Sequence, residues 1–177
     1  MAVFQSIRNL FVPPHFAEPE NTVPAPPTSY EIRPMSIGDL GELLNINARC
    51  FRNGENYTKH TFSYLLNDPS TVGYRMVTAE GKMAGFAFVM MNPDGAAHLT
   101  TIGIAPEHRR RGLGQQLVRH IEKTMSAKGV STIVLEVRVS NTAAQSLYRG
   151  IGFSSVQRVS KYYSDGEDGY LMMKSLV

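Results

Sequence analysis

The chain has 177 residues, of which 42% are hydrophobic, and its formal net charge is +3. This length and composition predict one folded domain with a single core, and the modest charge, much of it in one arginine run, argues against a nucleic-acid-binding surface. Cys50 is the only cysteine, which excludes an internal disulfide and leaves no basis for a cysteine-held metal. No apolar run approaches the ~20 residues that cross a bilayer, so we expect a cytoplasmic protein without a membrane partner and without a metal.

Residues 13–27 contain six of the ten prolines in the chain. Proline has no backbone N–H and cannot contribute donors to a regular hydrogen-bond ladder. We therefore predict that residues 1–29 form an extended arm or linker and that a folded domain spans residues 30–177. The sequence leaves open whether this arm is a dispensable tail or docks on the domain or on a partner.

Hydrophobic periodicity and turn residues divide the folded domain into strands and helices whose order predicts an α+β domain with helices covering a single sheet. Ser36 with Asp39 three residues later is a capping pattern, Thr58 is suited to start a second helix, and Gly129 to end the longest one. In chain order the pattern predicts a strand over 30–33, helices over 40–52 and 59–67, strands over 72–79, 83–91 and 97–104, a helix over 113–128, a strand over 132–139, a short helix over 141–148, and strands over 153–163 and 170–173.

A basic loop that contains glycine, Arg109-Arg110-Arg111-Gly112-Leu113-Gly114, joins the predicted strand over 97–104 to the long predicted helix. Glycine lets the backbone approach a ligand closely, and a helix N-terminus offers unpaired N–H groups and a partial positive charge. These features predict a phosphate or pyrophosphate site. The loop lacks the Gly-Lys-Ser/Thr of a Walker loop, and Leu117 stands where a dinucleotide fingerprint has its third glycine. A solvated basic turn is the alternative interpretation.

Four motifs in order make the chain similar to the GNAT acetyltransferases (GCN5-related N-acetyltransferases). The basic loop resembles their Arg/Gln-x-x-Gly-x-Gly/Ala pyrophosphate loop, and residues 101–106 resemble the strand before it. Residues 135–153 resemble the second half of the cofactor site, and residues 162–172 resemble the ending of RimI-type protein N-terminal acetyltransferases. The resemblance covers residues 30–176. It implies the GNAT fold, a mixed α/β arrangement with a single central, mostly antiparallel sheet of six to seven strands flanked by about four helices.

The resemblance implies acetyl-CoA as the acetyl donor and assigns two kinds of contact to it. The pyrophosphate is expected on the basic loop and helix start, and the extended pantetheine arm is expected to pair with the preceding strand. Asn141 is expected both to cap the following helix and to contact the cofactor arm. The cofactor-binding residues implied in this way are Ile102, Gly103, Ile104, Arg109, Arg110, Arg111, Gly112, Leu113, Gly114, Gln115 and Asn141.

Direct attack by an amine needs a base for the ammonium proton and an acid for the departing thiolate. The resemblance implies Tyr148 as the acid; on packing grounds alone it would be a core tyrosine. Three candidates for the base stay open. Glu136 comes first, because its place in an apolar strand resembles the arrangement of RimI-type enzymes. A carboxylate there either points to solvent or faces a cleft, where desolvation would raise its pKa. Glu55 comes second, and His98, whose imidazole titrates near neutrality, comes third.

The acceptor is expected to be the α-amine of a protein or peptide N-terminus, with a ribosomal protein among the candidates. An α-amine has a pKa of about 7.7–8.0 against about 10.4 for lysine, so a modest base suffices for it. Residues 54–57 resemble the peptide-binding loop of archaeal and eukaryotic members, although Gly54 replaces the usual proline. Alternatives are a small-molecule amine, a lysine side chain, and a non-catalytic module that binds acetyl-CoA. The residues expected at the acceptor are Glu55, Tyr57, Arg138 and Tyr163, with Tyr162 beside them.

Overall fold

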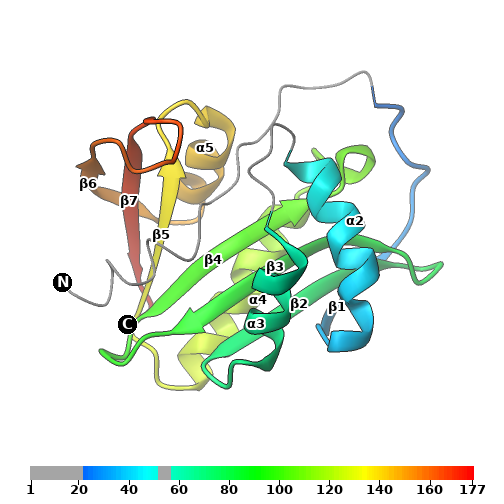
Figure 1. The fold of residues 1–177 in the computed structure, drawn as a ribbon, viewed down its shortest axis with the longest axis horizontal. Coiled ribbons are helices and arrows are strands. Elements are labelled where there is room, and N and C mark those ends of the chain that lie inside the picture. Colours follow the sequence, from blue (N-terminus) through cyan, green and yellow to red (C-terminus); the bar gives the residue numbers. More distant parts are fainter. Residues whose placement is uncertain (1–21, 52–56) are drawn as a thin grey trace.

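A seven-stranded sheet forms the centre of the molecule (Figure 1). The computed structural model describes residues 22–51 and 57–177. The strands lie in the order β1-β2-β3-β4-β5-β7-β6, and every neighbouring pair is antiparallel except β4 with β5. This arrangement confirms the predicted single, mostly antiparallel sheet. The strands are β1 (Tyr30–Pro34), β2 (Thr71–Thr78), β3 (Met83–Met91), β4 (Ala97–Ile104), β5 (Thr132–Arg138), β6 (Ser154–Val159) and β7 (Gly169–Ser175).

Helices cover both faces of the sheet. The pair α2 (Leu40–Cys50) and α3 (Lys59–Asn67) packs on one face, and the pair α4 (Leu113–Ala127) and α5 (Thr142–Gly150) packs on the other. None of the helices in the described part of the chain is long and apolar enough to span a membrane. Two 3-10 helices, η1 (Ile37–Asp39) and η2 (Pro106–His108), precede α2 and the basic loop.

Strand β3 supports both cores. Phe86, Phe88 and Met90 belong to the cluster beneath α2 and α3, whereas Ala87 and Val89 belong to the cluster beneath α4 and α5. Side chains alternate between the two faces of a strand, so a strand covered on both sides is apolar without interruption. This explains the continuous hydrophobic run in the sequence of β3.

Strands β4 and β5 pair over a short stretch and then diverge (Figure 1). Their parallel register joins Ala97 to Ile133 and His98 to Val134 and goes no further. Beyond these residues β4 stays paired with β3, and β5 stays paired with β7. Among the described residues, the facing edges of β4 and β5 therefore carry backbone groups that no partner strand satisfies.

A bulge in β4 lies where this divergence begins. Phe88 opposes Thr101 and Val89 opposes Leu99, which leaves Thr100 as the extra residue on β4. A bulge bends its strand and changes the direction of nearby side chains. The bulge therefore places polar residues of β4 at the opening between the two halves of the sheet.

The last two strands differ from their predicted bounds. β6 ends at Val159 instead of residue 163, because Lys161 adopts a φ of 49° and the chain turns back towards β7. Asp168 accepts hydrogen bonds from the Lys161 backbone N–H and from the Arg158 guanidinium, which closes this turn. β7 runs from Gly169 to Ser175 and is longer than the predicted 170–173. By contrast, β3 and β4 coincide with their predicted bounds.

Residues 22–29, the described part of the predicted arm, lie against the domain without regular secondary structure (blue in Figure 1). The Ala25 N–H donates to the Glu107 carbonyl over 2.9 Å, and the Arg111 guanidinium donates to the carbonyls of Ala25 and Pro26. Near the end of this segment the Thr28 hydroxyl accepts a hydrogen bond from the backbone N–H of Ala79, over 3.3 Å. These contacts dock this part of the arm on the domain.

Candidate active site

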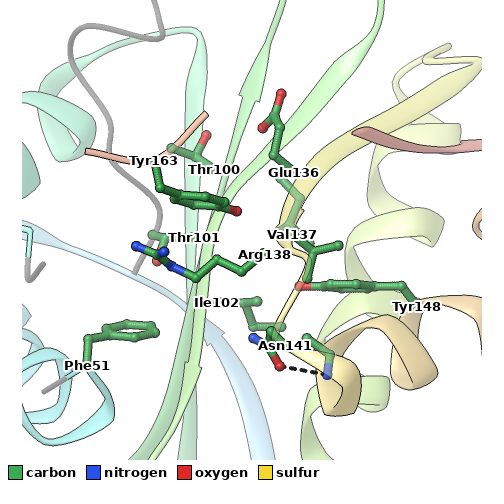
Figure 2. Close-up of a pocket in the computed structure, with 12 residues that line it drawn as sticks. Phe51, Thr100, Thr101, Ile102, Glu136, Val137, Arg138, Asn141, Tyr148 and Tyr163 are labelled. Carbon is green, nitrogen blue, oxygen red and sulfur yellow. Dashed lines mark hydrogen bonds between the residues drawn. The ribbon is translucent and has the colours of Figure 1, made fainter. Parts of the chain in front are cut away.

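A small cavity of about 40 Å³ opens where β4 and β5 separate (Figure 2). Three elements that are distant in sequence supply most of its wall: β4, the end of β5, and α5. Such a convergence of polar side chains in a concave site is the usual form of a binding or catalytic centre. The described residues that line it are Phe51, Leu99, Thr100, Thr101, Ile102, Glu136, Val137, Arg138, Asn141, Ala144, Tyr148 and Tyr163.

Two of the three candidate bases are in direct contact with each other. The His98 Nε2 atom lies 2.7 Å from Glu136 Oε2, and the exposed fractions of the two side chains are 7% and 6%. His98 is the last residue of β4 that pairs with β5, and Glu136 follows two residues after its counterpart Val134. The parallel register therefore brings these side chains together, with Glu136 at the cavity wall.

The predicted direction of the Glu136 pKa shift is wrong. Burial does raise the pKa of this carboxyl, but the charge of His98 and hydrogen bonds from His98 and Tyr162 outweigh it, so that the pKa lies below its ordinary value. Glu136 is consequently ionised at neutral pH. The sequence prediction considered desolvation alone and missed the partner on β4.

Tyr148 reaches the same cavity from α5 (Figure 2). Its side chain is buried, and burial raises the pKa of its hydroxyl, which therefore stays protonated across the physiological range. Asn141 starts the helix that carries it: the Asn141 Oδ1 atom accepts a hydrogen bond from the Ala144 N–H over 3.0 Å, as predicted for a cap. In Figure 2 the hydroxyl of Tyr148 points into the cavity and makes no hydrogen bond with the other residues drawn.

The basic loop presents its backbone, while two of its three arginine side chains are engaged elsewhere. Arg109 donates through Nε to the Ile104 carbonyl, and Arg111 donates to the arm. Only Arg110, which is exposed and has a φ of 63°, keeps a guanidinium without a described hydrogen bond. That the residues of this loop bind a pyrophosphate stays a prediction. Gly112, with a φ of 75°, starts α4, and within the described residues the N–H groups of residues 110–115 donate to no acceptor.

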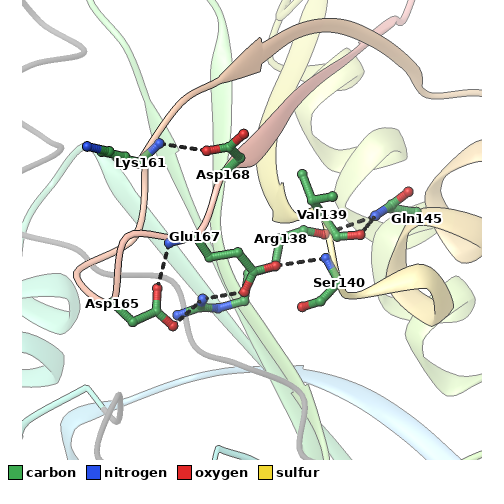
Figure 3. Close-up of polar contacts among 8 residues, drawn as sticks. All are labelled: Arg138, Val139, Ser140, Gln145, Lys161, Asp165, Glu167 and Asp168. Atoms are coloured by element: carbon green, nitrogen blue, oxygen red, sulfur yellow. Dashed lines mark hydrogen bonds and ion pairs between the residues drawn. The ribbon is translucent and has the colours of Figure 1, made fainter.

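A buried arginine holds the loop between β6 and β7 against the cavity (Figure 3). Arg138 is 1% exposed, and its Nη1 atom lies 2.8 Å from the Asp165 carboxylate and 2.7 Å from the Glu167 carboxylate. Its guanidinium also stacks 3.9 Å from the centre of the Tyr163 ring. Glu167 in turn accepts the Ser140 N–H, which ties this loop to the start of α5. Arg138 thus places Tyr163 at the cavity wall.

The elements that form this site lie within the part of the chain that matches a known protein family. The profile of the Acetyltransferase (GNAT) family matches residues 40–153, which is more than half of the chain and includes β4, the basic loop and α5. The chain belongs to the GNAT acetyltransferase family. It is accordingly an acetyl-CoA-dependent N-acetyltransferase.

The GNAT chain is similar over most of its length to proteins with assigned N-terminal activities. An N-alpha-acetyltransferase of Sulfurisphaera tokodaii is 32% identical to it over 83% of this chain and 93% of its own length. The N-alpha-acetyltransferase daf-31 of Caenorhabditis elegans is 34% identical over 82% of each chain. The crystal structure of the ribosomal-protein-S18-alanine N-acetyltransferase from Escherichia coli has a TM-score of 0.76 and 30% identity, covering 84% of this chain and 94% of that one.

The described residues of this GNAT chain fit acetyl-CoA at two places. The free N–H groups that open α4 suit a pyrophosphate, because they combine donors with the positive end of the helix. The unpaired edge of β4 suits an extended, amide-rich arm, which can add to the sheet like a strand. Ile102 lines the cavity, and Gly103 and Ile104 continue along this edge towards the basic loop.

The remaining predicted acceptor residues have different outcomes. Tyr57 is buried, its hydroxyl donates to the Thr100 carbonyl over 3.1 Å, and it is absent from the described cavity wall. Glu55 lies outside the described residues. Phe51 and Thr101 line the cavity but were not singled out in the sequence, because neither residue type marks a site without knowledge of the bulge in β4.

We expect Glu167→Gln to destabilise the enzyme by about 1–3 kcal/mol at pH 7, because a charged hydrogen bond to the buried Arg138 is lost. Burial raises the pKa of Glu167, but hydrogen bonds from Ser140 and the charge of Arg138 lower it by more than burial raises it. The net shift of the pKa is therefore downward. The stability from this group is therefore complete above the ordinary glutamate pKa of about 4.3 and is lost as the pH falls through the lowered value.

Thermal unfolding of wild type and Glu167→Gln at pH 7 and at pH 3 checks this expectation. The difference between the two proteins should shrink at the lower pH. Glu31→Gln is the matched control, because Glu31 pairs with Arg33 on the exposed surface, where ion pairs contribute little. A gap that stays constant with pH would show that the carboxylate charge of Glu167 is not the stabilising feature.

Proposed function

We propose that this protein transfers the acetyl group of acetyl-CoA to the α-amine of a protein or peptide N-terminus, by direct attack of the amine on the thioester. The observation that carries the proposal is the shared cavity of Glu136 and Tyr148, a protonated hydroxyl and an ionised carboxylate that face one small space. Acyl transfer to an amine requires both a general base, which takes a proton from the amine, and a general acid, which supplies one to the leaving group.

The Glu136–His98 pair is the base in this proposal. The ionised carboxylate of Glu136 attracts the incoming ammonium group and takes its proton, directly or through one water. His98 holds the carboxylate in place through a contact of 2.7 Å. A lowered pKa makes Glu136 a weak base, which suits an α-amine: with a pKa of about 7.7–8.0, roughly a tenth of it is already neutral at pH 7. Glu55, the other candidate base, keeps its place as an alternative.

Tyr148 is the acid in this proposal. Its protonated hydroxyl donates a hydrogen bond to the sulfur as the thiolate departs, and it stabilises the charge that develops there. The cap formed by Asn141 fixes the start of α5 and hence the position of Tyr148 on it. When acetyl-CoA is bound, the thioester supplies the activated acetyl group. In this proposal the N–H groups of β4 near the bulge, where pairing with β5 has ended, would polarise the thioester carbonyl.

The acceptor assignment is supported by the relatives. The Sulfurisphaera and Caenorhabditis proteins are described as N-alpha-acetyltransferases, and the Escherichia coli neighbour as an enzyme for the alanine of ribosomal protein S18. A ribosomal protein is therefore a candidate acceptor, and such an acceptor would place the reaction in the cytoplasm. Tyr163, over which the Arg138 guanidinium stacks, lines the cavity, and in this proposal its ring faces the acceptor.

A peptide library incubated with acetyl-CoA and read by mass spectrometry tests this proposal. Each peptide carries one internal lysine, and each is supplied with a free and with a blocked N-terminus. We expect acetylation at the α-amine of the free peptides and none on the blocked ones. Acetylation of lysine in both sets, or turnover only with polyamines or amino acids as acceptors, would contradict the proposed acceptor.

A further inference from the structure

We infer that residues 22–29 form a strap that holds the basic loop in the conformation that receives the coenzyme, so that the arm is a positioning element of the acetyl-CoA site. This inference rests on the coenzyme placement in the proposed function and extends it to a segment outside the family profile, which begins at residue 40. It concerns the described part of the arm alone.

The strap is hydrogen-bonded both to the turn that precedes the basic loop and to the loop itself. On the side before the loop, the Ala25 N–H donates to the Glu107 carbonyl in η2. On the loop itself, Arg111 donates through Nη1 to the Pro26 carbonyl over 3.1 Å and through Nη2 to the Ala25 carbonyl. These contacts join residues that are about 85 positions apart in the sequence.

Tyr30, the first residue of β1 and the residue that directly follows the strap, completes the connection. Its hydroxyl accepts from Arg111 Nη1 over 2.6 Å and lies 3.0 Å from His108 Nδ1. His108 is buried, and burial lowers its pKa, so that the ring is neutral and its Nδ1 atom can accept a hydrogen bond from the Tyr30 hydroxyl. One hydroxyl therefore ties the residue before the arginine run to the residue at its end.

The loop needs such support because its backbone is in an uncommon conformation. Arg110 has a φ of 63°, which a residue with a side chain rarely adopts and which persists only where the surroundings hold it. The strap together with Tyr30 fixes His108 and Arg111 on either side of Arg110, and within the described residues it uses none of the N–H groups of residues 110–115. It therefore supports the anion site without filling it.

Two substitutions in the full chain loosen the strap at different points. Ala25→Pro removes the N–H that donates to Glu107 in a segment already rich in proline, and Tyr30→Phe removes the hydroxyl shared by Arg111 and His108. Val23→Pro is the matched control: Val23 is 83% exposed, and its N–H makes no hydrogen bond within the described residues.

Calorimetry with coenzyme A and with acetyl-CoA measures the effect. We expect Ala25→Pro and Tyr30→Phe each to weaken binding about 3- to 10-fold, the range that one lost hydrogen bond gives, and Val23→Pro to bind as wild type does. In turnover the KM for acetyl-CoA should rise with kcat unchanged. Hydrogen exchange without coenzyme should be faster at residues 109–114 in the two strap variants.

Unchanged affinity and exchange in both strap variants would overturn the inference, as would tighter binding, which would mean that the strap obstructs the coenzyme. An equal loss in Val23→Pro would overturn it too. If Ala25→Pro does not fold, Tyr30→Phe decides. Coenzyme binding and exchange need no acceptor, so a wild type that binds coenzyme but acetylates no peptide would refute the proposed acceptor and leave the strap standing.

Discussion

Tyr148→Phe is expected to lower kcat by about 10²-fold or more, with the affinity for acetyl-CoA unchanged. The substitution removes only the hydroxyl, which points into the cavity and makes no hydrogen bond with the other residues drawn in Figure 2, so the fold should not suffer. The ring keeps its contact with Phe153, whose centre is 5.8 Å away. A loss confined to kcat is the signature of an interaction made in the transition state and not in the ground state.

Steady-state kinetics with a peptide acceptor, together with calorimetry on coenzyme A, checks this expectation. Tyr74→Phe is the matched control, because Tyr74 is equally buried at 5% exposure but packs against His120 on α4, away from the cavity. If Tyr148→Phe retained full turnover at saturating acetyl-CoA, the acid would have to be a different group.

Glu136→Gln is expected to lower kcat/KM by about 10²- to 10⁴-fold at pH 6.5, since the amide cannot take a proton. The variant can use only acceptor that is already neutral in solution. The fraction of neutral α-amine rises about tenfold per pH unit below its pKa of about 7.7–8.0. The wild type keeps its carboxylate ionised below the ordinary glutamate pKa and is less dependent on this fraction. The advantage of the wild type should therefore shrink as the pH rises through about 8.

A pH series of kcat/KM for both proteins measures this ratio. Glu122→Gln serves as the control for loss of a half-buried carboxylate, because Glu122 pairs with Lys174 and lies outside the cavity wall. A wild-type advantage that is the same at pH 6 and pH 9 would mean that Glu136 does not act as the base. In that case His98 and Glu55 are the groups to substitute next.

Features of the fold that depend on neighbouring residues were predicted well from the sequence, whereas features that depend on contacts between distant residues were not. The bounds of β3 and β4 follow from turn residues and apolar runs that lie within the strands themselves, and the α5 cap follows from Asn141 alone. The end of β6 depends instead on Asp168, which lies in the returning chain and accepts hydrogen bonds from Lys161 and Arg158. A propensity pattern read along residues 153–163 contains no information about that acceptor.

The same division applies to the site. Glu136 and Tyr148 could be singled out because the family motif fixes their places, and both reach one cavity. The direction of the Glu136 pKa shift could not, since it depends on a histidine 38 residues away that the register of β4 and β5 brings alongside. The engagement of Arg111 by the arm is equally invisible in a list of motifs, because the proline-rich segment shows no periodicity that would indicate a docking partner.

The short pairing of β4 with β5 divides the sheet into two parts, β1 to β4 and β5 to β7, which are joined by two residue pairs. His98 lies on β4 and Glu136 on β5, so their contact links the two parts of the sheet where the strands separate. A ligand that binds between the two parts of the sheet is coupled to this contact. Because such a coupling free energy is reciprocal, the contact alters the affinity for the ligand to the same extent as the ligand alters the stability of the contact. Substitutions that weaken the contact between His98 and Glu136 should therefore change the affinity for a ligand that binds between the two parts of the sheet.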